Sequence, residues 1–197
     1  SFIPYLKVNI FITLAYVIVG KIGLMIALPP GYSAAIWPAA GIAIAACVLW
    51  KEYAPWIGVF IGSLLINLNI SGHIHWGWLP FAISIVSSLR AVLSACVLGR
   101  VDHLFTLDNP NAVIKSCLSL ALTCTVATVF GNFSLVINGT IPQSDLLGSL
   151  INWWTGDLLG AVIFIPLTML LFDKRVIWRS RRIQTGVPLL VGFLFCV

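Results

Sequence analysis

The sequence predicts an all-α protein that crosses a membrane several times, a polytopic transmembrane helix bundle. Of its 197 residues, 60% are hydrophobic and only 9% are charged, and the mean hydropathy is +1.05. A soluble domain carries about 25% charged residues, so this chain lacks the polar surface that water requires. The apolar residues also gather in segments of about 20 residues, the length that a helix needs to cross a bilayer. These observations exclude a water-soluble globule.

Six apolar segments are long enough to be complete spans, and polar or basic residues separate them. Hydropathy places these spans at residues 8–28, 33–50, 54–70, 78–98, 113–133 and 146–172. A seventh begins near Thr185 and reaches only to Val197, which leaves 13 residues where a crossing needs about 20. We therefore expect residues 1–197 to form a single integral-membrane domain that is truncated at its C-terminal end.

The basic residues alternate along the predicted connections, which orients the bundle. Nine of the eleven Lys and Arg precede the first span or flank the connections after the second, fourth and sixth spans, and the other connections contain none. Cytoplasmic loops carry the excess of Lys and Arg, so this pattern places the N-terminus in the cytoplasm. The pI of 9.1 therefore reflects topology, and no nucleic-acid partner is expected.

Three charged residues lie inside predicted spans: Lys21, Arg90 and Asp157. A charge at the centre of a membrane helix costs about 2.5–3.5 kcal/mol on the insertion scale, so such a residue faces a partner or water. Arg90 lies about twelve residues from the predicted outer end of its span, and Asp157 lies at a similar depth in the sixth span. We expect the two to meet, directly or through a water or ligand, whereas Lys21 can extend outward to the interface.

Polar residues accompany these charges at helical spacing. Ser87, Arg90 and Ser94 repeat at i, i+3 and i+7 and predict one polar stripe on the fourth span. Three interpretations remain open: a buried pair that fixes helix register, a polar pocket open to the outside that binds a small ligand, or a path for protons or ions. The second interpretation gives seven candidate ligand-binding residues: Arg90, Asp157, Trp153, Asn152, Asn132, Trp37 and Asn67.

Glycines spaced four residues apart predict tight helix packing. Gly156 and Gly160 flank Asp157 on the sixth span, and Gly58 and Gly62 repeat the spacing on the third. Small residues at i and i+4 let two helix backbones approach closely in a membrane.

Two prolines, Pro38 and Pro166, fall within predicted spans. A proline removes a backbone hydrogen bond, so we expect each to kink its helix and to free carbonyl groups that line a cavity.

Catalytic machinery is not evident in the sequence. The chain contains no nucleophile–base arrangement, phosphate loop or paired carboxylates, so we expect no enzymatic chemistry, cofactor or metal. His73 and His75 form an H-x-H pair without a third ligand nearby, which is typical of a solvated loop.

An ordered set of motifs resembles a known family. The second span contains Ile36–Ala43, I-W-P-A-A-G-I-A, and Pro55–Gly58, P-W-I-G, follows it. The sixth contains Trp153–Gly160, W-W-T-G-D-L-L-G, with Pro166 six residues on. In this order the motifs resemble the first type of bacterial membrane-associated sensor domain, the MASE family, over about residues 10–172. The matching positions are Trp37, Pro38, Gly41, Trp153, Gly156, Asp157, Gly160 and Pro166.

The resemblance implies a sensory input domain in the bacterial inner membrane. In that family the domain precedes a cytoplasmic histidine kinase, GGDEF, EAL or PAS module, and such effectors act as dimers, so a homodimer through the output domain is implied. The ligand would be a small molecule or a membrane-protein partner. Arg90 departs from the pattern, because many relatives carry Glu in the fourth span, and an internal Arg90–Asp157 pair becomes more plausible. The alternative is a small-solute-binding transport subunit of the energy-coupling importer type, which also has about six helices.

Overall fold

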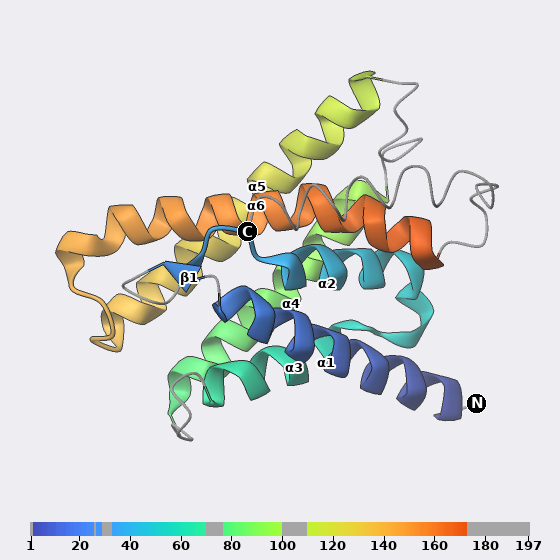
Figure 1. The fold of residues 1–197 in the computed structure, drawn as a ribbon, viewed down its shortest axis with the longest axis horizontal. Helices are drawn as coiled ribbons and strands as arrows, with labels where there is room; N and C mark the ends of the chain where they lie inside the picture. The colour runs from blue at the N-terminus through green and yellow to red at the C-terminus, as the bar shows by residue number, and fades with distance from the viewer. Residues whose placement is uncertain (1, 26, 29–32, 70–76, 100–109, 173–197) are drawn as a thin grey trace.

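The computed structural model describes residues 2–25, 27–28, 33–69, 77–99 and 110–172. These contain six α-helices, and four of them run roughly alongside one another while α4 and α5 cross the bundle obliquely (Figure 1). The helices are α1 (Phe2–Met25), α2 (Pro38–Leu49), α3 (Trp56–Leu68), α4 (Trp78–Leu98), α5 (Pro110–Ile137) and α6 (Leu146–Phe172). The remaining short elements are the two-residue antiparallel strands β1 (Ala27–Leu28) and β2 (Ser33–Ala34), and the 3₁₀ turns η1 (Lys51–Tyr53) and η2 (Gln143–Asp145).

The all-α class is confirmed, but the prediction of six complete spans is not. Four helices, α1, α4, α5 and α6, are long and apolar enough to cross a membrane, and α4 and α6 have the predicted bounds. Helix α2 has 12 residues and α3 has 13. At 1.5 Å per residue these helices are about 20 Å long, short of the ~30 Å hydrocarbon core. The predicted seventh span lies outside the described residues.

Helix α2 is short because the chain that precedes it is extended. Residues Ser33 and Ala34 pair with β1, and Pro38 occupies the first turn of the helix. Pro38 therefore begins α2 and does not kink it, which corrects the sequence prediction; proline is favoured there because the first N–H groups of a helix have no intrahelical partner. Pro166 does lie inside α6, as predicted.

Helix α2 is the most enclosed helix of the described structure. It contacts α1, α4 and α6, and nine of its twelve residues are buried, most of them alanines. In Figure 1 it lies between α1 and α6. A short helix is tolerated at membrane depth when protein surrounds its unpaired backbone groups, so burial explains why α2 need not span the bilayer.

Glycines set the contact between α2 and α6. The Trp37 N–H donates a hydrogen bond of 2.8 Å to the Gly156 carbonyl, which joins the start of α2 to α6. A Cβ on Gly156 would overlap the Ala34 carbonyl oxygen, and one on Gly160 would overlap the Trp37 carbonyl oxygen. The close packing predicted for this glycine face is confirmed.

A second glycine face joins α3 to α1. A Cβ on Gly58 would lie 2.7 Å from the Asn9 carbonyl oxygen, and one on Gly62 would lie 2.9 Å from Tyr16 Cβ. The buried Asn9 amide crosslinks the two segments, because it accepts from the Gly58 N–H at 2.8 Å and donates to the Tyr53 carbonyl at 2.8 Å.

At the end of α6, Phe172 packs edge-on against two other rings. Its centroid lies 5.7 Å from that of Phe11 on α1 and 5.4 Å from that of Trp50, which follows α2. Three helices therefore meet in one aromatic cluster at this end of the bundle.

Large apolar side chains cover the outer faces of the long helices. On α5, for example, Leu118, Leu122 and Phe130 are more than half exposed. An apolar outer surface around a buried polar interior is stable when lipid surrounds the protein, so this is a multi-pass integral membrane fold that contacts the bilayer.

The glycine contact gives a first prediction. Gly156→Leu and Gly160→Leu should each destabilise the bundle by about 1–3 kcal/mol or more, because the new side chain must displace backbone atoms. Gly148→Leu on the same helix is the matched control, since a Cβ on Gly148 would have nothing within 4 Å of it. Thermal unfolding in nanodiscs measures the effect, and equal melting temperatures for the three variants would disprove it.

Candidate functional site

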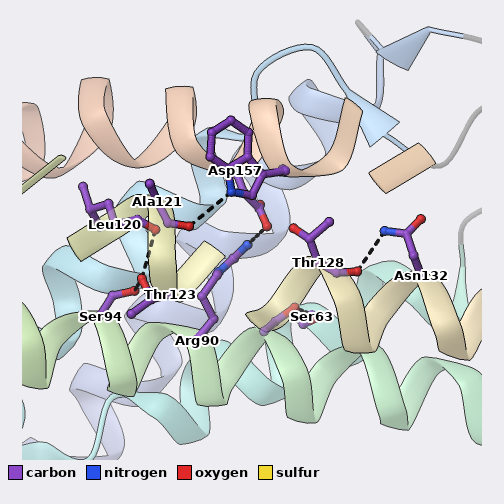
Figure 2. Close-up of polar contacts among 11 residues, drawn as sticks. Ser63, Arg90, Ser94, Leu120, Ala121, Thr123, Thr128, Asn132 and Asp157 are labelled. Atoms are coloured by element: carbon purple, nitrogen blue, oxygen red, sulfur yellow. Dashed lines mark hydrogen bonds and ion pairs between the residues drawn. The ribbon is translucent and has the colours of Figure 1, made fainter. Parts of the chain in front are cut away.

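The predicted meeting of Arg90 and Asp157 is confirmed. Arg90 Nη1 on α4 forms an ion pair with Asp157 Oδ2 on α6, and the side chains are only 3% and 0% exposed (Figure 2). Burial of both charges removes their hydration, which costs several kcal/mol per ion, and their mutual attraction offsets this only when the pair is intact. The pair therefore holds α4 and α6 together in a way that neither charge can do alone.

Glycine packing places Asp157 in this position. Gly156 and Gly160 bring α2 against α6 on either side of Asp157, so backbone excludes solvent from the carboxylate. Arg90 reaches it from the stripe of α4 that also carries Ser87 and Ser94, all of them buried.

Only one nitrogen of the Arg90 guanidinium, Nη1, has a partner among the described residues. Nε and Nη2 have no hydrogen-bond partner among the described residues, although the group is almost fully buried. Unpaired buried donors are costly, and most buried polar groups in proteins have a partner. Asp157 Oδ1 is also buried without a hydrogen-bond partner, so both members of the ion pair are only partly satisfied.

A small cavity of about 50 Å³ adjoins Arg90. One wall carries polar side chains and another carries aromatic rings, and the lining comes from every helix of the described structure or from the residues beside it. A cavity this size accommodates one or a few waters, whereas sites for small molecules typically measure about 300–1,000 Å³. The lining residues are Tyr16, Leu24, Ala34, Trp37, Ser63, Ile66, Asn67, Ile83, Ser87, Arg90, Leu135 and Trp153.

Hydrogen bonds organise the polar wall between α3 and α4. Ser63 Oγ donates to Ser87 Oγ at 3.4 Å, and Asn67 Nδ2 donates to the Ser63 carbonyl at 2.8 Å. Ser63 is 1% exposed, so this pair of hydroxyls carries polarity into the bundle beside Arg90.

A second polar line follows the contact of α4 with α5 (Figure 2). The Ser94 and Thr123 hydroxyls lie 2.7 Å apart and share a hydrogen bond. Further along α5, Asn132 Nδ2 donates to the Thr128 carbonyl at 2.9 Å. Among the described residues, Asn132 Oδ1 and Thr128 Oγ1 are buried without a hydrogen-bond partner.

The seven candidate residues fall into three groups. Arg90, Trp153, Trp37 and Asn67 line the cavity, and Asp157 is the ion-pair partner of Arg90. Asn132 is fully buried on α5 but does not line the cavity. Asn152 is exposed on α6, because it lies one residue, and so about 100° of helix rotation, before Trp153.

Tyr16 is a cavity residue that sequence reasoning missed. It lies on α1, is 1% exposed and lines the cavity together with Arg90. Its position in the sequence could have identified it. Tyrosines of membrane helices gather at the interfaces, whereas Tyr16 lies midway along an apolar span.

Trp153 owes its position to another glycine. A Cβ on Gly131 of α5 would lie 2.9 Å from the Trp153 ring, so the indole rests directly on this helix. The contact turns Trp153 toward the cavity and fixes part of the aromatic wall.

A polar, ion-paired interior inside an apolar bundle defines the chain as a multi-pass membrane protein with a buried polar site. Its family follows from comparison with known proteins: the MASE1 family model matches residues 8–196, and the chain belongs to this family. MASE1 is a membrane sensory input domain, so this segment is sensory and not itself catalytic. No curated protein and no solved structure matches the chain.

The ion pair predicts strong coupling between two substitutions. Arg90→Gln and Asp157→Asn should each destabilise the protein by about 3–5 kcal/mol, because each leaves a buried charge without its partner. The double variant should recover part of that loss. Unfolding free energies of the four proteins measure the coupling, with Lys21→Gln, at an exposed position, as the control. Strictly additive losses would show that the two residues do not interact.

Proposed function

We propose that this MASE1 domain detects a small ligand at the Arg90 cavity and controls a cytoplasmic histidine kinase or a GGDEF or EAL module. One observation carries the proposal: the buried ion pair joins α4 to α6, and its cation also lines the cavity. A ligand that binds Arg90 therefore acts on the same group that holds the two helices together. The candidate ligand-binding residues remain Arg90, Asp157, Trp153, Asn132, Trp37 and Asn67, with Asn152 at the exposed margin.

The signal would be a shift between two packings of the bundle. A ligand changes such an equilibrium only through its different affinity for the two states. The cavity of about 50 Å³ represents a closed packing, and a larger ligand would favour a packing in which α4 and α6 are spaced differently. Helix α6 extends from the ion pair to the aromatic cluster at Phe172, so it connects the cavity with the opposite end of the bundle.

The cavity would open to the outside of the bacterial inner membrane. It is lined by Leu24 near the end of α1, Asn67 near the end of α3 and Ile83 near the start of α4. With the N-terminus in the cytoplasm, as the basic residues indicate, all three belong to the outer half of the bundle. The sensor would then read the outside and pass the signal to an output module, which would hold two copies together as a homodimer.

The family match favours sensing over the alternative of solute transport, because MASE1 is a membrane sensory input domain. Cavity size does not separate the two, since the cavity of about 50 Å³ beside Arg90 is smaller than a typical small-molecule site of about 300–1,000 Å³ in either case.

Orientation can be tested by accessibility. In a background without native cysteines, Ser144→Cys should react with a membrane-impermeant thiol reagent in intact cells, and Glu52→Cys should react only after permeabilisation. Both positions are exposed in the structure, so burial does not bias the comparison. The reverse labelling pattern would invert the proposed topology.

Sensing can be tested in the full natural protein by its output, either phosphotransfer or cyclic dinucleotide. The Arg90→Gln/Asp157→Asn double variant should fold but lose the response to stimulus, because it lacks the cation that reads the ligand. A double variant that responds normally would contradict the sensory role of the Arg90–Asp157 pair and would show that the pair is structural only. Lys21→Gln, away from the cavity lining, is the control and should respond like the wild type.

A further inference from the structure

Thr128 on α5 places a hydroxyl in the buried interior without a hydrogen-bond partner among the described residues. A hydroxyl within a membrane helix often bonds to a carbonyl one turn earlier on its own helix. Thr125, Ser134 and Thr155 do so here. The Thr128 hydroxyl does not, although its side chain is only 2% exposed. It therefore has no partner on α5 and is available to a neighbouring helix.

The contact between α5 and α6 places Thr128 at the depth of Asp157. These helices are joined by the short connection 138–145 and run antiparallel. A Cβ on Gly131 of α5 would lie 2.9 Å from the Trp153 ring of α6, so these two residues are in contact. Thr128 lies three residues before Gly131, and Asp157 lies four residues after Trp153. Both therefore lie about one turn from this contact in the same direction.

The contact between α4 and α5 gives the same depth. The Ser94 and Thr123 hydroxyls lie 2.7 Å apart across these antiparallel helices. Arg90 lies four residues before Ser94, and Thr128 lies five residues after Thr123, on the same side of this contact. In Figure 2 the Thr128 hydroxyl points toward the carboxylate of Asp157, which Arg90 reaches from α4. Three helices thus direct polar groups to one depth.

Asp157 Oδ1 is the acceptor that matches this hydroxyl. It is buried without a hydrogen-bond partner among the described residues, and an ionised carboxylate accepts hydrogen bonds but donates none. Thr128 Oγ1 and Asp157 Oδ1 have almost no accessible surface, and neither residue lines the cavity beside Arg90. Because no water or ligand can reach these two atoms, only another protein group can pair with them.

We propose that Thr128 is a third member of the buried site and that its hydroxyl donates a hydrogen bond to Asp157 Oδ1 in the second packing of the bundle. The inference rests on the proposed function, because it names the contact that the shift between packings forms. In the described packing neither atom has a partner. A movement of α6 toward α5 changes the spacing of α4 and α6 and forms this bond. Thr128 is then a positioning residue, which acts on Arg90 through Asp157.

The bond makes two packings of similar free energy possible. A change in the α4–α6 spacing weakens the ion pair between Arg90 and Asp157, which is unfavourable. The new bond offsets this, because an O–H group that donates to a carboxylate forms a charge-assisted bond about twice as strong as a neutral one. It also pairs two buried groups that are costly to leave without partners.

Trp153 connects this contact with the cavity. Its ring lines the cavity and also rests on Gly131, about one turn of α5 from Thr128. A group that displaces the ring would alter the space between α5 and α6 where Thr128 and Asp157 face each other. The effect of a ligand would therefore reach α5 as well as α6.

The test measures exchange between the two packings in the protein in nanodiscs, without a ligand. The methyl groups of Thr, Val and Leu are labelled with ¹³C, and relaxation dispersion detects a minor state populated at about 0.1–10% on the μs–ms timescale. The Thr128 methyl group should show dispersion. The methyl group of Thr155, whose hydroxyl bonds to the Ile151 carbonyl at 2.8 Å, should not.

Thr128→Val is the decisive variant, since valine has nearly the shape of threonine without the hydroxyl. Exchange at position 128 should disappear, and the Tm should rise by about 2–4 °C, because the described packing loses a buried hydroxyl that has no partner. Thr155→Val is the matched control: it should leave the dispersion of Thr128 unchanged and should not raise the Tm. Thr128→Ser keeps the hydroxyl, so exchange should persist at Leu135, which lies on α5 and lines the cavity.

Three results would overturn the proposal: no dispersion at Thr128 in the wild type, exchange at position 128 that persists in Thr128→Val, or a Tm that falls in this variant. The second result is expected if Asp157 Oδ1 instead pairs with Nη2 of Arg90 in a bidentate ion pair.

The bond and the proposed function fail separately. Exchange that requires the Thr128 hydroxyl, in a full protein whose output is unchanged by Thr128→Val, would support the bond and refute its role in sensing. An output that is lost in the Arg90→Gln/Asp157→Asn variant, in a protein without exchange at Thr128, would support the sensory role and overturn the bond.

Discussion

The contact between the start of α2 and the glycine face of α6 is the constraint on which the rest of the structure depends. The Trp37–Gly156 backbone hydrogen bond and the bare surfaces of Gly156 and Gly160 bring two helix backbones together. This contact buries Asp157, and a buried carboxylate in a membrane protein requires a cation at the same depth. Arg90 supplies it, and the placement of α4, the polar stripe and the cavity follow from that pairing.

The polar interior is arranged so that lipid never meets it. Lipid-facing positions on α5 carry Leu118 and Leu122, whereas Ser94 and Thr123 satisfy one another at the α4–α5 contact. Hydroxyls that bond to a carbonyl one turn earlier, as Ser84 does to Pro80, remain compatible with a membrane helix. Arg90 departs from this pattern, as Thr128 and Asn132 do, because its Nε and Nη2 are buried without a hydrogen-bond partner among the described residues.

Much of this arrangement could be predicted from sequence, for identifiable reasons. The bounds of α4 and α6 were correct because sharp changes in hydropathy mark their ends, and the ion pair was correct because depth can be counted from those ends. The length of α2 was not predicted, since residues 33–37 are mostly apolar but not helical: Ser33 and Ala34 form β2, and the helix begins at Pro38. Hydropathy also does not determine how each helix is rotated about its axis, because packing against other helices decides that. For this reason Asn152 was assigned to the site although it is exposed, and Tyr16 was missed although it lines the cavity.

The aromatic cluster at the end of α6 connects this end of the helix to α1 and to the residue that follows α2. Helix α6 is held at Gly160 by α2 and reaches Phe172, whose ring touches Phe11 and Trp50. The twelve residues between those points extend about 18 Å, and Pro166 interrupts the hydrogen-bond ladder midway. A tilt of α6 about Gly160 would therefore displace its far end more than the glycine contact itself, and the Phe11, Trp50 and Phe172 rings would have to repack.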